Sequence, residues 1–337
     1  MHLAEQMGRY GRREFLRRLG GAGGALALGG HAATPERAPA RQRSNAIYLI
    51  RMQGRSGVPG TVRRLSPDGY FIQPMLDARG ESVLFWGRQE GETGFNLWRY
   101  DLEPRRSSKL TDDRALAGHP FWTADGRQLV YFSNAGVATD TDWNMDHQFD
   151  AGRSPRNLWI MDRDGGHRRR LTTGPHVDER PCITPDGRTV VFVSDRSGHQ
   201  NLWQVNTATG ELKQVTKHAG LDYRPVFSPD GRQLAFFTSN TPRGLHDLCL
   251  MQWPGGATSF PVRQGSFRWI HGPFWCADGR TILIHGHAAG DKTYALWLLE
   301  LASRQVERIE LPGIPAYAHG SLNADRSVLI FDSKHLL

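Results

Sequence analysis

Residues 223–240 read YRPVFSPDGRQLAFFTSN, in which a Pro-Asp-Gly turn separates two short apolar runs and a polar break follows the second. An Asp-Gly pair between two alternating apolar segments predicts a β-hairpin, because glycine accepts the positive φ that a tight turn requires. Five other segments of the chain repeat this pattern, and their spacing indicates a repeat architecture. The turn residues recur at intervals of 46, 61, 44, 48 and 47 residues: Gly80, Gly126, Gly187, Gly231, Gly279 and Arg326.

A third strand is expected after each hairpin, and it carries a second signature. The tripeptide Asn-Leu-Trp occurs at 96–98, 157–159 and 201–203, with weaker versions at 247–249 and 295–297. A fourth strand ends in Lys-Leu-Thr, Arg-Leu-Thr or Gln-Val-Thr in three of the repeats. Four short strands in a repeat of about 45 residues describe one blade of a β-propeller.

The last repeat stops after two strands, at Asp332. The two strands that it lacks are expected at the other end of the chain, in 46–48 and 62–66. Pairing the N-terminal strands with the C-terminal blade would place both ends of the chain in one sheet and close the ring. The sequence therefore predicts an all-β fold, a six-bladed β-propeller, as a single domain over residues 41–337.

The first 40 residues resemble an export signal. The hexapeptide RREFLR at 12–17 is similar to a twin-arginine motif, and the apolar stretch 19–30 that follows is too short to span a bilayer. Small residues offer cleavage after Ala32 or Ala40. The alternative is a short basic N-terminal helix. We expect removal of residues 1–40 and export to the periplasm or the medium, without a lipoprotein anchor, because no cysteine precedes Cys182.

Composition argues against several classes of partner. The formal net charge is +8, and part of it lies in the arginines of the leader. The remaining excess is spread along the chain without a basic stripe interleaved with aromatic residues, so we expect no nucleic-acid partner. We also expect no membrane insertion and a monomer. A mild positive charge is compatible with attraction of an acidic ligand.

The three cysteines each lie inside an expected strand. We interpret them as buried apolar fillers rather than disulfide partners, since their number is odd: Cys182, Cys249 and Cys276. The twin-arginine route exports folded cargo, so folding would take place in the reducing cytoplasm, where unpaired thiols are common.

Equivalent positions on the innermost strands predict a ring of side chains at one mouth of the channel. The innermost strand of each blade starts at that mouth, so residues seven positions before each turn residue should face one another. These six ring positions are Gln73, His119, Arg180, Arg224, Gly272 and His319. His271 precedes its ring position by one step, and a bulge at Gly272 would be needed to bring its side chain to the same face.

Three imidazoles and an amide oxygen from adjacent blades could hold a divalent metal ion. The predicted ligands are Gln73, His119, His271 and His319. No local motif marks such a set, so the hypothesis depends on the alignment of the repeats. The alternative for each histidine is a hydrogen-bonded residue at the start of a strand.

The repeats, over about residues 45–337, resemble the WD40-like (PD40) repeat of the TolB propeller and of oligogalacturonate lyases. The segments IHGPFWCADG, YFIQPMLDARG and YAHGSLNADRSVLIFDS are similar to the lyases. This resemblance implies a divalent ion such as manganese at His271, Gln73 and His319. The chain departs from the lyase pattern at Tyr317, where a second histidine is expected, and His119 would supply the missing ligand.

The lyase resemblance also implies β-elimination on an acidic, uronate-containing oligosaccharide. Metal bound to the sugar carboxylate would acidify the adjacent proton. Arg180 and Arg224 are the candidate catalytic residues, and with Tyr223 they would bind the substrate. The base stays open, with Tyr223 and His176 among the candidates. The alternative is a non-catalytic, TolB-like periplasmic propeller that binds a protein or peptide partner over the same face.

The second repeat is longer than the others by about 15 residues, between Asn134 and Asn157. The insertion carries polar side chains at alternate positions: Asp140, Asp142, Asn144 and Asp146. Their spacing is similar to the first half of a calcium-binding loop, but methionine stands where such a loop needs glycine. We interpret the insertion as a polar loop on the same mouth as the ring.

Overall fold

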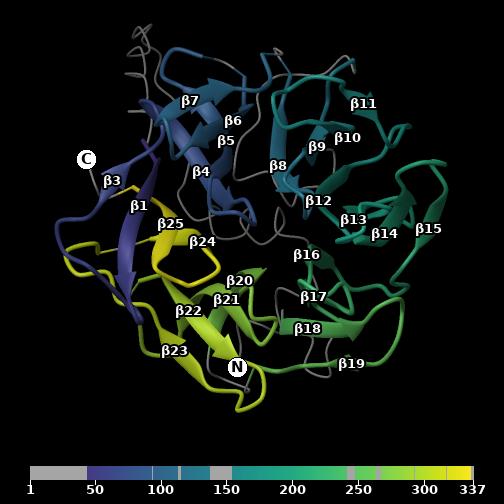
Figure 1. Ribbon diagram of the computed structural model, residues 1–337. Helices are drawn as coiled ribbons and strands as arrows, with labels where there is room; N and C mark the ends of the chain where they lie inside the picture. Colours follow the sequence, from purple (N-terminus) through teal and green to yellow (C-terminus); the bar gives the residue numbers. More distant parts are fainter. Residues whose placement is uncertain are drawn as a thin grey trace, which may run out of the picture. The chain divides into compact units, whose positions relative to one another are not determined.

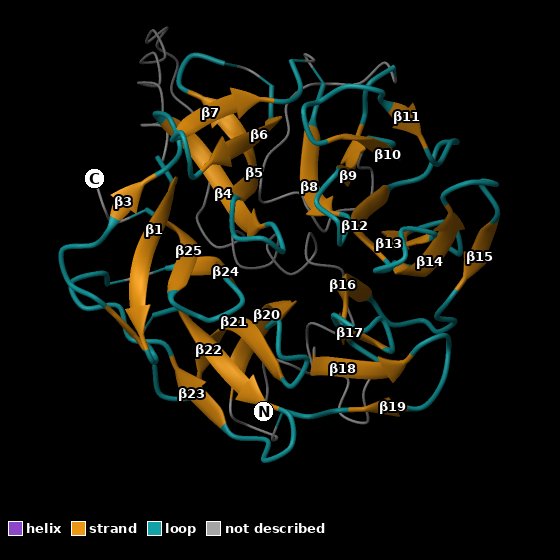
Figure 2. Ribbon diagram, in the orientation of Figure 1, coloured by secondary structure: helices purple, strands orange, loops and turns teal. Residues whose placement is uncertain are grey.

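The computed structural model describes residues 44–92, 94–112, 115–136, 154–240, 247–262, 267–291, 293–315 and 317–334, without the side chains of residues 268, 269 and 271. In these ranges the regular secondary structure is β-strand throughout, drawn as orange arrows in Figure 2. No helix in them is long and apolar enough to cross a membrane. The expected signal at 1–40 and most of the insertion in the second repeat lie outside the described residues.

Five sheets of four consecutive antiparallel strands form the first five blades. In the first three the strands are β4 (Gly69–Leu76), β5 (Ser82–Gln89), β6 (Asn96–Asp101), β7 (Arg106–Lys109); β8 (Ala117–Trp122), β9 (Gln128–Ser133), β10 (Asn157–Asp162), β11 (Arg169–Arg170); and β12 (Asp178–Ile183), β13 (Thr189–Ser194), β14 (Asn201–Asn206), β15 (Leu212–Gln214). The next two contain β16 (Asp222–Phe227), β17 (Gln233–Thr238), β18 (Asp247–Gln252), β19 (Thr258–Ser259); and β20 (Phe267–Trp275), β21 (Thr281–Ala288), β22 (Ala295–Glu300), β23 (Val306–Arg308). Figure 1 shows the sheets arranged around a common centre, with the first strand of each blade innermost.

The sixth blade joins the two ends of the described chain. It contains β24 (Ala318–Leu322) and β25 (Val328–Ser333) from one end, and β1 (Ala46–Gln53), β2 (Ser56–Gly57) and β3 (Arg63–Arg64) from the other. Strands β1 and β25 pair over six residues, from Ala46 opposite Ser333 to Arg51 opposite Val328, and β3 then pairs with β1. The predicted six-bladed propeller, closed between N-terminal strands and the C-terminal blade, is confirmed.

The Asp-Gly turns form where the repeat predicts them. All six turn positions have positive φ, between 59° and 72°, and in each the backbone N–H of the turn residue donates to the carbonyl three residues earlier. Glycine adopts this conformation at no steric cost, which explains its presence in five of the six turns. The sixth turn residue, Arg326, has φ 59°.

The tryptophan of the third strand pairs across the sheet with a residue of the fourth, outermost strand. Trp98 lies opposite Lys109, Trp159 opposite Arg170 and Trp297 opposite Arg308. In each pair the cation lies over the indole ring, 4.8–5.9 Å from its centroid. A long cationic side chain on the outermost strand covers an apolar ring and places a charge on an exposed sheet edge, which disfavours edge-to-edge association.

Apolar side chains fill the spaces between neighbouring sheets. Trp86 of the first blade packs against Phe132 of the second, with ring centroids 6.2 Å apart. The cysteines belong to this interior: Cys182, Cys249 and Cys276 are buried and free. Burial raises the pKa of the Cys249 thiol to about 12 and that of Cys276 to about 11. The interpretation of the cysteines as unpaired fillers is confirmed.

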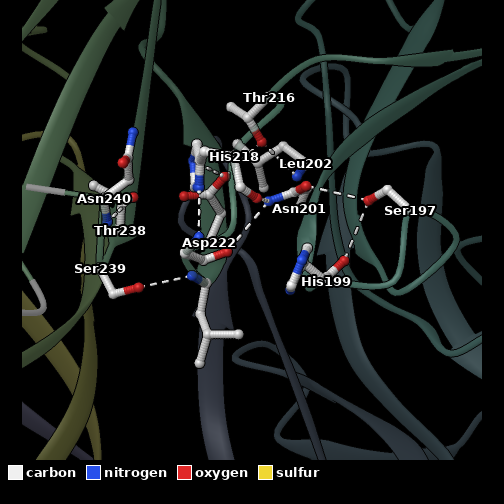
Figure 3. A network of polar contacts seen from close by, with 12 residues as sticks. Ser197, His199, Asn201, Leu202, Thr216, His218, Asp222, Thr238, Ser239 and Asn240 are labelled. Atoms are coloured by element: carbon white, nitrogen blue, oxygen red, sulfur yellow. Dashed lines mark hydrogen bonds and ion pairs between the residues drawn. The ribbon is translucent and has the colours of Figure 1, made fainter. Parts of the chain in front are cut away.

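A polar network connects the third and fourth blades (Figure 3). The Nε2 atom of His218 lies 3.0 Å from a carboxylate oxygen of Asp222, and Thr216 donates its hydroxyl to the same oxygen. The Nδ1 atom of His218 accepts a hydrogen bond from the backbone of Gly220, so the ring proton lies on Nε2. Burial raises the pKa of Asp222. These contacts fix the connection that leads into β16 and its ring residue.

Candidate functional site

A β-bulge occurs at the ring position of every innermost strand. In the first blade, Gln73 and Pro74 together oppose the one residue of β5 between Leu84 and Trp86. Four other blades show the same two-against-one arrangement, and in the sixth blade one extra residue, His319, is inserted. The ring residues have φ between 34° and 68°: Gln73, His119, Arg180, Arg224, Gly272 and His319. The six positions predicted by counting are therefore structurally equivalent.

Proline follows the ring residue in the first five blades: Pro74, Pro120, Pro181, Pro225 and Pro273. Proline has no N–H to contribute to a β-ladder, so within sheets it is confined to edge strands and bulges. The innermost strand of each blade is such an edge. The repeated X-Pro pair is a sequence signal for the bulge that the sequence analysis did not use.

Five of the six ring residues are not glycine, although they adopt a left-handed backbone conformation. This conformation costs an L-residue with a side chain about 1–2 kcal/mol, and such strain is often found at functional sites. The strain is repeated around the ring with polar or charged side chains. The side chains at this mouth are thus retained at the expense of stability.

Arg224 reaches across the fifth blade to the sixth. Its Nη2 atom lies 3.3 Å from Nε2 of His319, and Nδ1 of His319 lies 2.9 Å from Oδ2 of Asp332. A Cβ at Gly272 would lie 3.5 Å from Nη1 of Arg224 and 4.0 Å from the His319 ring, which is ordinary van der Waals contact. The glycine of the fifth blade therefore lies beside the guanidinium of the fourth.

Arg180 belongs to a second buried chain of charges. Its Nε atom lies 3.4 Å from Oε1 of Glu179, and the other carboxylate oxygen of Glu179 accepts a hydrogen bond of 2.9 Å from Arg156. The side chains of all three residues are 5% exposed or less. Arg180 is therefore held in place by its neighbour in sequence, with a carboxylate already beside it.

The first and second blades contribute an amide and an imidazole. The indole N–H of Trp86 donates to Oε1 of Gln73 at 2.8 Å, and the backbone N–H of Gln73 donates to Asp332 at 2.9 Å. His119 lies between aromatic rings, with its centroid 5.1 Å from Trp86 and 5.5 Å from Phe132. The carboxylate of Asp332 thus connects the sixth blade to the first through both His319 and Gln73.

The electrostatic balance of the ring favours neutral imidazoles. Burial, followed by repulsion from Arg180 and Arg224, lowers the pKa of His119 well below its usual value. Burial also lowers the pKa of His319, although Asp332 opposes this shift. The pKa of Arg224 falls to about 9, because of burial first and Arg180 second. The ring therefore carries its positive charge on arginines.

A small cavity of about 60 Å³ lies inside the ring, lined by the ring residues of the first five blades, by prolines that follow them and by a second row of side chains. The second row is apolar, and its members include Met75, Phe121, Val226 and Phe274. A mainly apolar lining with a few polar groups is typical of ligand sites, and a cavity of about 60 Å³ is large enough only for a small group of a ligand.

The structure brings together three of the four predicted metal ligands at equivalent positions, Gln73, His119 and His319. The side chain of His271 lies outside the described residues. Its backbone pairs with His285, whose ring lies 5.2 Å from that of His319. Within the described part of the chain, no group of three or more His, Cys, Asp and Glu side chains is arranged to hold a metal ion.

Tyr223, predicted to bind substrate, lies in the core. It is 4% exposed, its ring stacks on Phe237 at 5.4 Å, and burial raises its pKa to about 12. A phenol with this pKa is protonated at neutral pH, which disfavours the role of a base. His176, the other named candidate, lies 3.7 Å from Asp195.

Three residues of the site were missed from the sequence: Asp332, Glu179 and His285. Asp332 was recognised only as the end of the last strand, and Glu179 was not considered. His285 lies on the second strand of its blade, and its approach to His319 of the next blade is a tertiary contact. The repeat alignment contains no signal for contacts of this kind.

Comparison with known proteins supports the fold. Residues 150–246 match the family model described as the TolB beta propeller domain. The Tol-Pal system protein TolB of Bordetella pertussis is 48% identical over 42 residues, which are 12% of this chain and 10% of that protein. An uncharacterized peptidase of Bacillus subtilis, YuxL, is 29% identical over 96 residues, which are 28% of this chain and 12% of the peptidase. The chain thus spans about a tenth of the length of these relatives.

Two solved structures are similar over most of the chain. TolB from Acinetobacter baumannii superposes with a TM-score of 0.55 and 16% identity, over 79% of this chain and 64% of that one. An oligogalacturonate lyase in complex with manganese gives a TM-score of 0.53 and 17% identity, over 84% of this chain and 71% of the lyase. The propeller fold is shared with a TolB and with a lyase, and at these identities the likeness concerns the fold alone.

Proposed function

We propose that this propeller binds the carboxylate of an acidic ligand at the ring mouth, with an acidic oligosaccharide as the first candidate. The observation that carries the proposal is the state of Arg224. Arg224 is half-buried at the mouth, and its hydrogen-bond partner among the described residues is the neutral ring of His319. No carboxylate of the described residues lies within ion-pair distance of it.

A desolvated cation without a carboxylate in direct contact is unfavourable, and burial together with Arg180 lowers the pKa of Arg224 although Asp332 and Glu179 oppose the shift. A ligand carboxylate would supply the missing charge and accept two parallel N–H bonds from the guanidinium. Arg180, on the adjacent blade, would add to the positive potential while its pairing with Glu179 keeps it in place. The arginines of the site are therefore pre-organised to bind an anion.

The predicted metal site fits the described residues poorly. A metal would need the lone pair of Nε2 on His319, and the cationic guanidinium of Arg224 lies at that nitrogen. The amide oxygen of Gln73 is engaged by Trp86. The contact between His319 and Asp332 is a common support for a metal-bound histidine, but the adjoining arginines repel a cation.

Lyase activity is the second candidate, favoured by the contact between His319 and Asp332. Asp332 accepts the Nδ1 proton and leaves a lone pair on Nε2, which is the arrangement of a general base. Once Arg224 turned to the ligand carboxylate, Nε2 would take the proton adjacent to that carboxylate. The electron pair of the C–H bond would form the new double bond, the adjacent C–O bond would break, and water would protonate the leaving oxygen.

Export and a protein partner complete the proposal. The twin-arginine motif supports export to the periplasm, and replacing Arg12 and Arg13 by Lys should leave the precursor in the cytoplasm. Normal accumulation of that variant outside the cytoplasm would contradict the export route.

The similarity to Tol-Pal system proteins supports a protein or peptide partner. An acidic group of that partner would bind at the same mouth.

Isothermal titration of the purified protein with trigalacturonate and with an acidic peptide tests the binding function. We expect Arg224→Gln to weaken binding about tenfold to a hundredfold, the range expected for loss of one charge-assisted pair. Arg232→Gln is the matched control, because Arg232 is exposed on the turn of the same blade. Equal affinity of the wild type and Arg224→Gln would contradict the proposal. An absorbance assay for the unsaturated product, with His319→Gln as the variant, tests the second candidate.

A further inference from the structure

An exposed aromatic ring lies next to the ring mouth, on the fifth blade. Tyr294 is 43% exposed and directly precedes β22. The other large apolar side chains exposed in the described residues are aliphatic, Val62 and Leu212. Tyr294 is thus the one aromatic side chain among the large exposed apolar side chains of the described residues.

Two imidazoles support this ring from β21. The centroid of Tyr294 lies 5.1 Å from that of His285 and 5.4 Å from that of His287. His287 is itself fixed, because its Nε2 atom contacts the backbone carbonyl of Asp291 at 2.5 Å. A tyrosine supported in this way loses little conformational entropy when a ligand packs on it.

The aromatic platform is continuous with the carboxylate site. His285 lies between Tyr294 and His319, with centroid distances of 5.1 Å and 5.2 Å. The ring of Tyr294 therefore lies no farther than about 10 Å from that of His319. Gly272 lies at the inner end of this path, because a Cβ on it would be 3.9 Å from Cβ of His285 and 3.5 Å from Nη1 of Arg224.

We infer that Tyr294 forms a second subsite, which stacks the sugar ring next to the one whose carboxylate binds Arg224. This inference rests on the proposed function. One face of a pyranose ring presents mainly C–H groups and packs on an aromatic ring, while its hydroxyls stay in water. The two centroid distances of 5.1 Å and 5.2 Å place the rings of Tyr294 and His319 within reach of one short oligosaccharide. Tyr294 therefore determines that the ligand is a chain of at least two sugars.

The residue types of the two subsites favour this ligand over an acidic peptide. A charged end group with an adjacent flat apolar surface matches a uronate chain, in which each carboxylate is attached to a ring. An acidic peptide such as triglutamate carries flexible carboxylates without rings. It would gain from Arg224 and little from Tyr294.

Titration calorimetry with galacturonate, trigalacturonate and triglutamate separates these possibilities. We expect Tyr294→Ala to weaken the binding of trigalacturonate about three- to tenfold, the range for one aromatic contact, and to leave the affinity for galacturonate unchanged. Leu212→Ala is the matched control, since it removes an exposed apolar side chain from the outermost strand β15. Circular dichroism of each variant checks the fold.

The other outcomes of this experiment distinguish a failure of the second subsite from a failure of the proposed function. Loss of binding in Arg224→Gln with no effect of Tyr294→Ala would overturn the second subsite and leave the proposed function intact. An equal effect of Tyr294→Ala on triglutamate would overturn the assignment to sugars. Wild-type protein that binds none of the three ligands would overturn both the proposed function and the subsite.

Discussion

Two sets of six left-handed residues encircle the channel, and their residue types are opposite. One set is formed by the turn residues of the six hairpins, and we call their end of the channel the turn mouth. Five of these six positions are glycine, with φ between 63° and 72°. At the ring mouth, one position is glycine and five carry Gln, His or Arg, with φ between 34° and 55°. The backbone requirement is similar at both ends. Where the fold needs only a turn, the chain uses the residue without strain, and where side chains remain in spite of strain they serve another purpose.

Opening the circle of sheets would destroy both sets at once, and we expect this to be the largest effect. Deletion of residues 41–66 removes β1, β2 and β3 and leaves the edge of β25 without its partner. The deletion variant should aggregate and lose its cooperative thermal transition, measured by circular dichroism. Deletion of residues 1–40 is the control and should melt like the full chain. A soluble 41–66 deletion that melts cooperatively would contradict the closure.

The ring mouth depends on hydrogen bonds between residues far apart in the sequence, whereas each turn is closed by a backbone hydrogen bond within its own hairpin. Asp332→Ala removes the acceptor for both the backbone N–H of Gln73 and the Nδ1 atom of His319. We expect the free energy of unfolding in urea to fall by about 2–4 kcal/mol, because two buried donors lose their partner. Asp325→Ala, in the exposed turn of the same hairpin, should cost less than about 1 kcal/mol. Equal costs would show that the two mouths are supported in the same way.

Exchanging residue types between the two mouths tests the comparison directly. Gly187→Ala should cost about 1–2 kcal/mol of unfolding free energy, since φ is 72° and no atom lies within 4 Å of the new Cβ. Arg224→Gly should raise the unfolding free energy by about 0.5–1 kcal/mol, because relief of strain exceeds the entropy gained by the unfolded chain. It should also abolish ligand binding. A large loss of stability in Arg224→Gly would mean that the side chain serves the fold.

A pH titration of stability gives the smallest expected effect. The pKa of His119 is lowered in the folded state, so the unfolded chain binds a proton first as the pH falls below about 6.5. The stability present above that pH is lost progressively toward acid. His119→Gln gives the ring position of the second blade the residue type that the first blade has there, Gln73. This variant should lose less melting temperature than the wild type between pH 7.5 and pH 5.5. The control His167→Gln changes an exposed histidine whose pKa Asp162 raises, and it should not reduce that loss.

The sequence predicts features that are local or repeated. Gly231 in its Asp-Gly turn and Trp159 in its Asn-Leu-Trp signature specify hairpins and blades, and counting from the turns places all six ring residues correctly. Contacts between blades were not predicted, because the approach of Arg224 to His319 joins side chains 95 residues apart in the sequence, across the intervening fifth blade. The bulge at Gly272 that His271 would need is present, and every other blade has a bulge at the same position. The side chain of His271 lies outside the described residues, so its orientation stays a prediction.

The sixth blade contains strands from both ends of the described chain, and this has a consequence for folding during synthesis. About 275 residues separate the end of β1 from the start of β25. At roughly 5–20 residues per second, β1 waits about 14–55 s for its partner after it has been made. During that interval β2 and β3 can pair with one edge of β1, but the edge that pairs with β25 stays open while five blades form. An early strand with one edge that stays unpaired until β25 is made makes completion of the chain a condition for the ring, and with it for the ligand site.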